Sequence, residues 1–365
     1  MEIYFYLFFV IFIFSLFEIT LDERSPVRKG MLFITYILSI LVVGMRWRTG
    51  TDWEPYLTTF SSLDDSLLVS IRNNPGMEIG YLIFNWFVNL FSSNYSVFLV
   101  LHAAIYYYCI LWGLAKVTKF PHLSFLLLFS DTLGVLGSNR QLLAVAIIFY
   151  AMTLAIERNK KYFLYVLMAM WFHVTAVITS IFYLLNKKIS IKIILGSVLI
   201  AAIVGYSPLP QMIFGFLGGM SEISSGKVEV YANSKASATL GLLGMVRRGL
   251  FLVFFLLIRE SLEKHFGNYN FFLNIFVCSL LIYLIFGSSL TILVNRGSLY
   301  FNIVQGVLLT APLYMFKRYD TKYLYALILF ALSFVFVYQS ISTYADLFDP
   351  YQGIWYNDNF YRPVY

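Results

Sequence analysis

Charged residues able to do chemistry gather in one short stretch, 44–60, with the sequence GMRWRTGTDWEPYLTTF. Arg46 and Arg48 can hold phosphate oxyanions, because the guanidinium group binds them through a bidentate fork. Asp52 or Glu54 can accept a proton from a hydroxyl group, as a general base does. The stretch therefore predicts a site that binds phosphate and removes a proton. An ordinary interfacial loop with aromatic residues is the alternative.

Aromatic rings accompany these charges. Trp53 and Tyr56 offer faces on which the C–H groups of a sugar can pack. The pair Asp52-x-Glu54 could also bind a hard cation through oxygen atoms, but the arginines beside it argue against a need for metal. The chain has no H-E-x-x-H, P-loop, G-x-S-x-G or cysteine-rich metal spacing. We therefore expect no metal and no cofactor.

Two further patches lie between apolar segments. The turn 137–141, with the sequence GSNRQ, holds Arg140 and Gln141 as candidates for substrate binding, although Arg140 could instead form a structural pair with Asp131. His173 lies in WFHVT and could act as a base or bind phosphate, although a lone histidine in an apolar stretch is more often structural. We rank the candidate bases in the order Asp52, Glu54, Asp131 and His173.

The amino-acid composition indicates a protein whose surface faces mainly lipid. Of the 365 residues 60% are hydrophobic and only 12% are charged, which is about half the charged share of a soluble domain. The net charge of +7 comes from short basic runs between apolar segments, a pattern of cytoplasmic loops rather than of a nucleic-acid surface. Cys109 and Cys278 lie inside apolar segments, so no disulfide is expected.

The apolar segments predict an all-α polytopic membrane protein with a single transmembrane domain over 1–365. A spanning helix needs about 20 residues, and about ten segments approach that length. A short interfacial helix is expected near 79–91, and a pair of short helices is expected around His173. The first segment lacks a basic start and a cleavage site, so we expect it to be retained. The predicted full spans are 3–19, 31–45, 96–115, 123–137, 141–156, 189–205, 245–258, 269–286, 298–316 and 323–340.

Six basic runs set the orientation if all of them are cytoplasmic. Both termini are then outside, the turn at His173 is outside, and the external segments are 46–95, 206–244 and 341–365. A single crossing over 162–185 is the alternative and would invert everything after it. Eight of the ten Lys and Arg residues outside these runs are Arg, which favours phosphate recognition over a plain topology signal. Pairing of these arginines with external acids such as Asp64 or Glu78 is the alternative.

Short motifs follow one another in a fixed order along the chain. They are R-x-G-x-D-x-x-x-Y at Arg48, Gly50, Asp52 and Tyr56; Glu78-Ile79-Gly80-Tyr81; Asn139-Arg140-Gln141; Phe172-His173; Arg296 before Tyr300-Phe301; and a closing Tyr361-x-Pro363. In this order they resemble the EpsG-like group of Wzy-type polysaccharide polymerases over nearly the whole chain. One departure is Glu78-Ile79-Gly80, where Glu-Pro-Gly is expected.

The resemblance implies a multi-pass protein of the bacterial inner membrane. Such enzymes join oligosaccharide units carried on undecaprenyl pyrophosphate, outside the cytoplasm, with membrane lipid and possibly a chain-length regulator protein as partners. The layout also resembles membrane-embedded lipid-dependent glycosyltransferases. The predicted catalytic residues are Asp52, Glu54 and His173. The predicted substrate-binding residues are Arg46, Arg48, Trp53, Tyr56, Glu78, Arg140, Gln141, Arg247, Arg248, Arg296 and Tyr300.

Three other functions fit part of this pattern. An O-antigen ligase uses the same donor, but we expect it to carry a larger external loop. A lipid-linked oligosaccharide flippase needs charges through both leaflets, whereas the charges here gather on the outer side. A scaffold subunit of a polysaccharide machine is the third.

Overall fold

The computed structural model is helical, as predicted. It describes residues 2–50, 52–212, 238–287, 294 and 297–354. Within these ranges the one strand-like contact is an isolated antiparallel bridge between Arg46 and Gly353. Arg296 and the tail 355–365, both part of the sequence predictions, lie outside the described residues.

The α-helices in chain order are α1 (Glu2–Glu18), α2 (Pro26–Ser39), α3 (Trp53–Ser61), α4 (Leu67–Asn73), α5 (Ile79–Asn89), α6 (Tyr95–Val117), α7 (Pro121–Thr132), α8 (Asn139–Tyr150), α9 (Met152–Ile156), α10 (Tyr162–Phe172), α11 (Ile191–Gly205), α14 (Ala238–Leu257), α15 (Arg259–His265), α16 (Tyr269–Phe286), α18 (Leu299–Asn302), α19 (Gln305–Thr310) and α20 (Tyr319–Ile341). Five further short helical segments are η1 (Ile40–Gly44), η2 (Leu133–Val135), η3 (Val174–Leu184), η4 (Ala311–Tyr314) and η5 (Ser342–Leu347).

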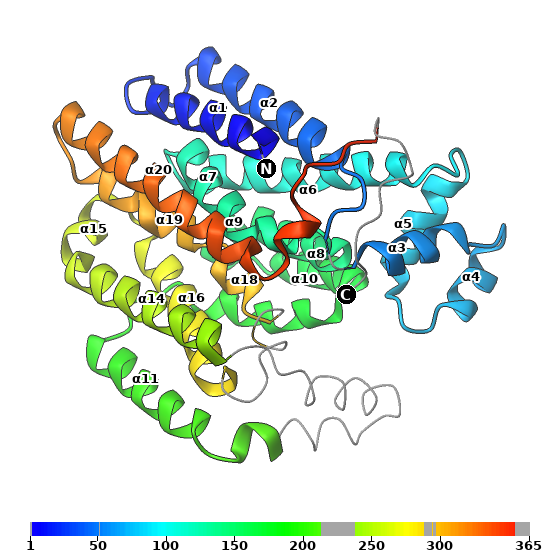
Figure 1. Ribbon diagram of the computed structural model, residues 1–365. Coiled ribbons are helices and arrows are strands. Elements are labelled where there is room, and N and C mark those ends of the chain that lie inside the picture. The colour runs from blue at the N-terminus through cyan, green and yellow to red at the C-terminus, as the bar shows by residue number, and fades with distance from the viewer. Residues whose placement is uncertain (1, 51, 213–237, 288–293, 295–296, 355–365) are drawn as a thin grey trace. The chain divides into compact units, whose positions relative to one another are not determined.

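The helices form two compact units. Unit 1 holds Met1–Ser180 and Phe316–Tyr365, and unit 2 holds Ile181–Met315. In unit 1, α6 packs against α7, α8 and α2, while α7 also packs against α1 and α20 (Figure 1). The prediction of one transmembrane domain stays a prediction.

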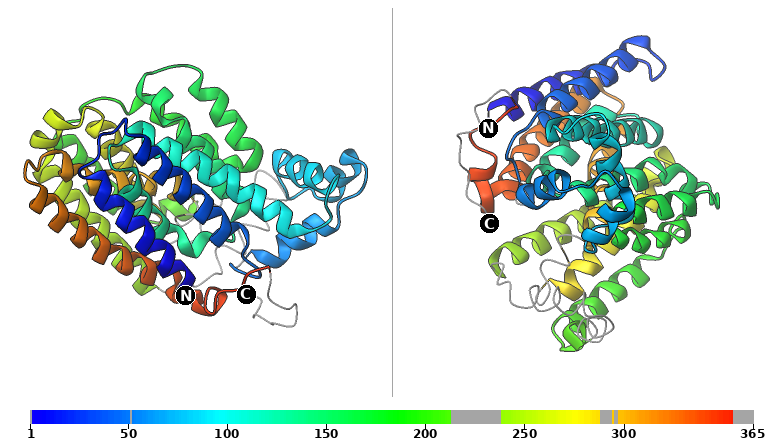
Figure 2. Two further views of the ribbon diagram at one scale, coloured as in Figure 1. Left: turned by 90° about the horizontal axis from the view of Figure 1, so that it is seen from above. Right: turned by 90° about the vertical axis from the view of Figure 1, so that its right-hand side faces the viewer.

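Three short helices, α3, α4 and α5, lie together beyond one end of the unit 1 bundle (Figures 1 and 2). Isolated helices this short are marginal in water, so packing must stabilise them. A buried aromatic cluster supplies this packing. Phe60 of α3 and Tyr81 of α5 both contact Phe98 near the start of α6, with ring centroids 5.8 and 5.7 Å apart. The aromatic residues of 44–60 and 79–91 thus anchor these helices.

The predicted pair of short helices around His173 is present as α10 and η3. His173 adopts an extended backbone between them, with φ −158° and ψ 115°. The Tyr162 hydroxyl at the start of α10 donates to Thr179 O in η3 at 2.9 Å. Two helices running straight on could not make this contact, so the chain reverses at His173.

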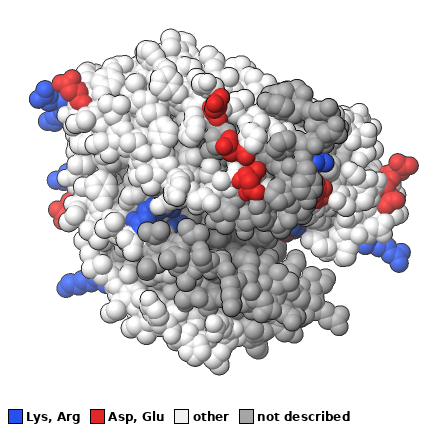
Figure 3. Space-filling model, viewed as in Figure 1, with Lys and Arg blue, Asp and Glu red and all other residues white. Residues whose placement is uncertain are grey.

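Four helical stretches in the described part of the chain are long and apolar enough to cross a membrane: Pro26–Gly44, Tyr95–Val117, Tyr269–Phe286 and Tyr319–Ile341. Several other predicted spans are shorter or broken, as where α7 gives way to η2. A Cβ at Gly134 in η2 would overlap the backbone of Ser340, so this break lets the two segments approach. The count of about ten spans stays a prediction. Few described side chains are charged on the face seen in Figure 3, as a lipid-facing surface requires.

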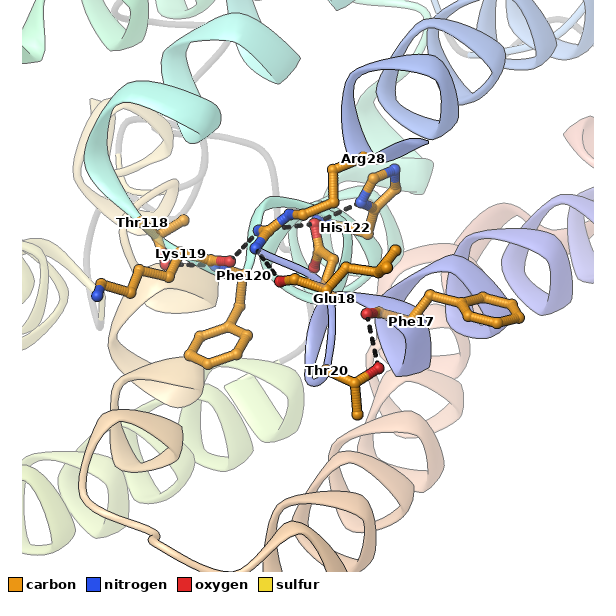
Figure 4. A network of polar contacts seen from close by, with 9 residues as sticks. Phe17, Glu18, Thr20, Arg28, Thr118, Lys119, Phe120 and His122 are labelled. Atoms are coloured by element: carbon orange, nitrogen blue, oxygen red, sulfur yellow. Dashed lines mark hydrogen bonds and ion pairs between the residues drawn. The ribbon is translucent and has the colours of Figure 1, made fainter. Parts of the chain in front are cut away.

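Away from α3, a buried cluster joins the end of α1 to the starts of α2 and α7 (Figure 4). The Glu18 carboxylate accepts from the backbone N–H of His122 at 3.0 Å and from its Nδ1 at 2.5 Å. Arg28 Nη2 lies 3.7 Å from Glu18 and also donates to Lys119 O. All three side chains are buried, so Glu18 serves both as the counterion of Arg28 and as the cap of α7.

In unit 2, α16 packs against α11 and α14. Arg259 at the start of α15 is buried and donates to Ile189 O at 2.7 Å and to Asn270 Oδ1 at 2.6 Å. Its Nε donates to Glu263 at 2.8 Å, and Lys188 binds the other oxygen of that carboxylate at 2.5 Å. Arg259 thus fixes α15 to the segment before α11.

Candidate functional site

The loop after α2 and η1 is held by the end of the described chain. Trp47 N–H donates to Gln352 O at 2.9 Å, and Ile354 N–H donates to Met45 O at 2.9 Å. The Tyr351 hydroxyl donates to Val42 O at 2.8 Å. This pairing fixes the backbone from which Arg46 and Arg48 project.

Arg46 turns inward and is only 1% exposed. Its Nη1 donates to Val43 O at 2.8 Å, and its Nη2 donates to Leu136 O and Asn139 Oδ1, both at 2.9 Å. Burial lowers the pKa of Arg46. Its guanidinium faces protein groups, so this placement does not support the predicted contact with phosphate. Arg46 instead joins the 45–47 segment to the 136–139 turn.

Arg48 and Gly50 both have left-handed backbone conformations, with φ 42° and 94°. Such a conformation is unusual for a residue with a side chain and is often found where function demands it. A Cβ at Gly50 would lie 2.6 Å from Gly137 Cα, so glycine is required for the two loops to meet. The glycine of R-x-G-x-D therefore sets the contact between the 46–52 loop and the 136–139 turn.

Asp52 stands at the N-cap of α3, but its carboxylate does not cap that helix. Instead it accepts a hydrogen bond from Ser138 Oγ at 3.2 Å. This is the one polar contact of the Asp52 side chain with the described residues, so most of its acceptor capacity is unused there. Glu54, two residues further along, makes no hydrogen bond or ion pair with the described part of the chain. Both side chains are partly exposed.

Arg140, at the start of α8, pairs with Glu78 rather than with Asp131. Its Nη1 lies 2.5 Å from Glu78 Oε2 and donates to Gly76 O at 3.3 Å, and its Nε donates to the Tyr56 hydroxyl at 3.3 Å. The expected alternative of an arginine paired with an external acid is thus present at Glu78. Nη2 has no acceptor among the described residues, and 16% of the side chain is exposed. One edge of the guanidinium is therefore open to an oxyanion.

Neighbouring groups keep Arg140 charged. Burial alone would lower the pKa of Arg140, but the nearby Tyr56 and Glu78 raise it above its usual value. The other carboxylate oxygen of Glu78 accepts from Val174 N–H at 3.5 Å, next to His173. His173 Nδ1 lies 2.6 Å from Thr175 Oγ1. Glu78 thus links Arg140 to the turn between α10 and η3.

The structure therefore joins four of the predicted motifs in unit 1. Asp52, Tyr56, Glu78 and Arg140 are connected by hydrogen bonds and one ion pair, and the His173 turn borders them. Trp53 is buried between Trp47 and Tyr95, so the predicted sugar platform is largely covered there. Tyr56 and Gln141 are also buried.

The other predicted residues belong to unit 2. Arg248 is buried on α14, where its guanidinium carbon lies 3.6 Å from the centroid of the Tyr283 ring. Arg247 precedes it on the same helix and is partly exposed, and Tyr300 of α18 is buried. Arg296 lies outside the described residues. The predicted role of Arg296 in substrate binding stays a prediction.

Sequence reasoning missed Tyr95 and His102 of α6 as contributors to the site. His102 Nε2 donates to Asn139 O at 2.8 Å, and Asn139 Nδ2 donates to the Tyr95 hydroxyl at 3.1 Å. A single polar group in a long apolar segment was the available signal, since such groups seek a partner. Their partner lies 37 or 44 residues away, which no local pattern reveals.

The order and spacing of these motifs have a counterpart among known families. The model of the EpsG family matches residues 29–353. The chain belongs to the EpsG family. Membership indicates a function of the polysaccharide-polymerase type, performed by a membrane protein. No curated protein and no solved structure gave a match.

The EpsG-family site offers two chemical capacities. The Asp52 carboxylate can accept a proton, and the open edge of Arg140 can hold an oxyanion. Within the described residues, no three His, Cys, Asp or Glu side chains gather as a metal site would need. The predictions that no metal and no cofactor are required stay predictions.

Proposed function

We propose that this EpsG-family protein joins oligosaccharide units carried on undecaprenyl pyrophosphate into a polysaccharide, on the outer side of the bacterial inner membrane. The observation that supports it most is the turn 138–140. Ser138 binds the Asp52 carboxylate, while Arg140 two residues later offers one open guanidinium edge. One short segment thus binds the proposed base through Ser138 and carries the anion-binding group, Arg140.

The proposed reaction is the transfer of a glycosyl group. An acceptor hydroxyl oxygen attacks the anomeric carbon of the donor, and the bond from that carbon to the pyrophosphate oxygen breaks. The lipid pyrophosphate leaves with the bonding electron pair, and Asp52 takes the hydroxyl proton. Arg140, with Arg48, stabilises the charge that grows on the leaving group. Because pyrophosphate is a good leaving group, the step needs no general acid.

Chain growth by the purified protein tests this proposal. The protein in lipid nanodiscs is given synthetic lipid-pyrophosphate-linked repeat units with chelator present, and products are separated on a gel. A ladder of oligomers is expected. Units left at their starting length would overturn the proposal, and a ladder that appears only without chelator would overturn metal independence.

A strain lacking the gene separates the alternatives. Loss of a polymerase should leave a single repeat unit attached at the cell surface, whereas loss of a ligase or a flippase should leave none. Restoring the gene on a plasmid should return the full ladder.

A further inference from the structure

Asn139 lies between the residue that binds the proposed base and the residue proposed to bind the leaving group. Ser138 before it binds Asp52, and Arg140 after it binds Tyr56 and Glu78. Its own side chain takes no part in either contact and is 2% exposed. A polar side chain buried in this way normally has its hydrogen bonds fulfilled, and those of Asn139 come from two other elements.

Three buried side chains hold Asn139 from different directions. Arg46 Nη2 donates to its Oδ1 at 2.9 Å, and its Nδ2 donates to the Tyr95 hydroxyl at 3.1 Å. His102 Nε2 lies 2.8 Å from its backbone oxygen. A carbonyl oxygen can only accept, so His102 carries a hydrogen on Nε2. The side-chain amide is therefore engaged at both ends, and the backbone is fixed as well.

Arg46 extends this hold over the whole turn. The same Nη2 also donates to Leu136 O at 2.9 Å, so one guanidinium binds residues 136 and 139 together. Burying a cation is costly unless its donors are satisfied, and packed apolar residues would stabilise the loop as well. Arg46 donates to three neutral acceptors, and a buried arginine of this kind fixes the position of the turn.

We infer that Asn139, held by Arg46, Tyr95 and His102, is the positioning residue that sets the placement of the Asp52 carboxylate relative to the Arg140 guanidinium. The inference rests on the proposed function, because it assigns these two groups to one reaction. Asn139 touches neither the reacting atoms nor the leaving group. It acts through Ser138 and Arg140, its neighbours in the chain.

Asn139→Ala tests this directly. The variant keeps the bond from His102 to the backbone but loses the bonds to Arg46 and Tyr95. A displacement of about 1 Å of catalytic groups can cost about 100-fold in rate, so we expect kcat to fall roughly 100-fold. In an Asp52→Asn background the added loss should be less than about threefold, because misplacing an absent base costs little.

A matched control separates positioning from general loss of stability. Asn274 of α16, in unit 2, is also buried, and its Nδ2 donates to Leu185 O and Lys187 O, both at 2.8 Å. Asn274→Ala should lower the melting temperature comparably but leave kcat of the folded protein within about threefold of the parent. If Asn139→Ala does not fold, Tyr95→Phe removes one hydroxyl only and should give an intermediate fall in kcat.

The outcomes distinguish the inference from the proposed function. If the parent does not extend lipid-linked units, both fall together. If the parent extends them but Asn139→Ala or Tyr95→Phe loses no more kcat than Asn274→Ala, positioning alone is overturned. Equal losses from Asn139→Ala with and without Asp52 would also overturn it, since that result indicates an independent structural effect.

Discussion

Asp52 and Glu54 are two carboxylates two residues apart, yet their surroundings differ. Asp52 is oriented by the Ser138 hydroxyl, while Glu54 has no polar contact with the described residues. We expect Asp52→Asn, which keeps the shape and removes basicity, to slow chain growth by ~10²–10⁴-fold, a usual cost of losing a general base. Glu54→Gln should stay within about threefold of the parent. Rates measured with purified lipid-linked units decide this, and the reverse ranking would transfer the base role to Glu54.

Arg46 and Arg140 allow a second comparison, because one is enclosed and the other has an open edge. We expect Arg140→Lys to raise the KM for the lipid-linked donor about 10–100-fold, since a point charge cannot serve Glu78, Tyr56 and a phosphate oxygen together. Arg46→Lys should leave KM nearly unchanged. It should lower the melting temperature and kcat, because the backbone carbonyl groups of Val43 and Leu136 lose their guanidinium donors. Kinetics and thermal unfolding of both variants check this. A rise in KM for Arg46→Lys alone would contradict it.

The types of the site residues could be predicted from the sequence, but their burial could not. Arg46 and Arg48 lie two residues apart in the stretch 44–60, and the local sequence pattern does not distinguish them. Arg46 is buried because its partners at 136 and 139 come from a distant turn. In the same way Arg140 pairs with Glu78 rather than with Asp131, which is nearer in the sequence. Partner choice depends on tertiary packing, which local residue patterns do not encode.

Helix positions were easier to predict because apolar length dictates them in lipid. The parity of the basic runs also predicted the reversal at His173, and the bond between Tyr162 and Thr179 shows it. The breaks in the predicted spans 123–137, 141–156 and 298–316 were not predicted. At Gly134 the break reflects a close approach to Ser340 of the last long helix, a contact between residues 206 positions apart.

The Glu18 cluster makes the junction of α1, α2 and α7 sensitive to one charge. In Glu18→Gln an amide would face the donors of His122 and Arg28, so a buried cation loses its partner. Breaking a buried pair in this way typically costs ~3–5 kcal/mol. Glu23→Gln is the matched control, because its pair with Lys119 is 2.7 Å long but about half exposed, and exposed pairs contribute up to ~1 kcal/mol. Thermal unfolding in detergent should show a large drop for Glu18→Gln and almost none for Glu23→Gln, and equal drops would contradict this.

The attachment of α15 should depend on pH. Burial alone would raise the pKa of Glu263, but hydrogen bonds from Lys188, Arg259 and Asn270 lower it overall. Because the pKa of Glu263 is lowered in the folded state, its carboxylate stabilises unit 2 at pH values above its ordinary pKa of about 4.3. This stabilisation is lost as the pH falls through the lower folded-state pKa. The melting temperature of the parent should therefore exceed that of Glu263→Gln at neutral pH, and the gap should close in acid. A gap that is independent of pH would contradict the assignment.

At the scale of the molecule, the candidate site lies at one end of the unit 1 helices and basic residues lie at the other end. Helix α6 begins at Tyr95, which binds Asn139, and ends at Val117, two residues before Lys119. Its 23 residues span about 34 Å, slightly more than the hydrocarbon thickness of a bilayer. Helix α10 runs from the basic residues 158–161 toward Val174 beside Glu78, but its 11 residues cover only about 16 Å, about half of that thickness. This agrees with a site on one side of the membrane and basic runs on the other, as the proposed reaction outside the cytoplasm requires.

Labelling of single cysteines tests that orientation. Cys109 and Cys278, both free and within α6 and α16, are first replaced by Ser. A cysteine at exposed Arg72 on α4 should react with an impermeant thiol reagent in intact spheroplasts, because α4 lies at the site end. Cysteines at the exposed positions Lys119 and Lys160 should react only after the membrane is opened. Labelling of Lys160 in intact cells would invert α10 and contradict an outer turn at His173.

Lys188 extends the same test past the hairpin. The chain turns back at His173, so Lys188 should again face the cytoplasm, whereas a single crossing over 162–185 would place it outside. Its side chain is 63% exposed, which makes the position accessible once the reagent reaches that side of the membrane. Protection of Lys188 in intact spheroplasts, with labelling after lysis, is expected. Labelling without lysis would mean that α10 and η3 carry the chain across once, which would invert the orientation of everything after the His173 turn.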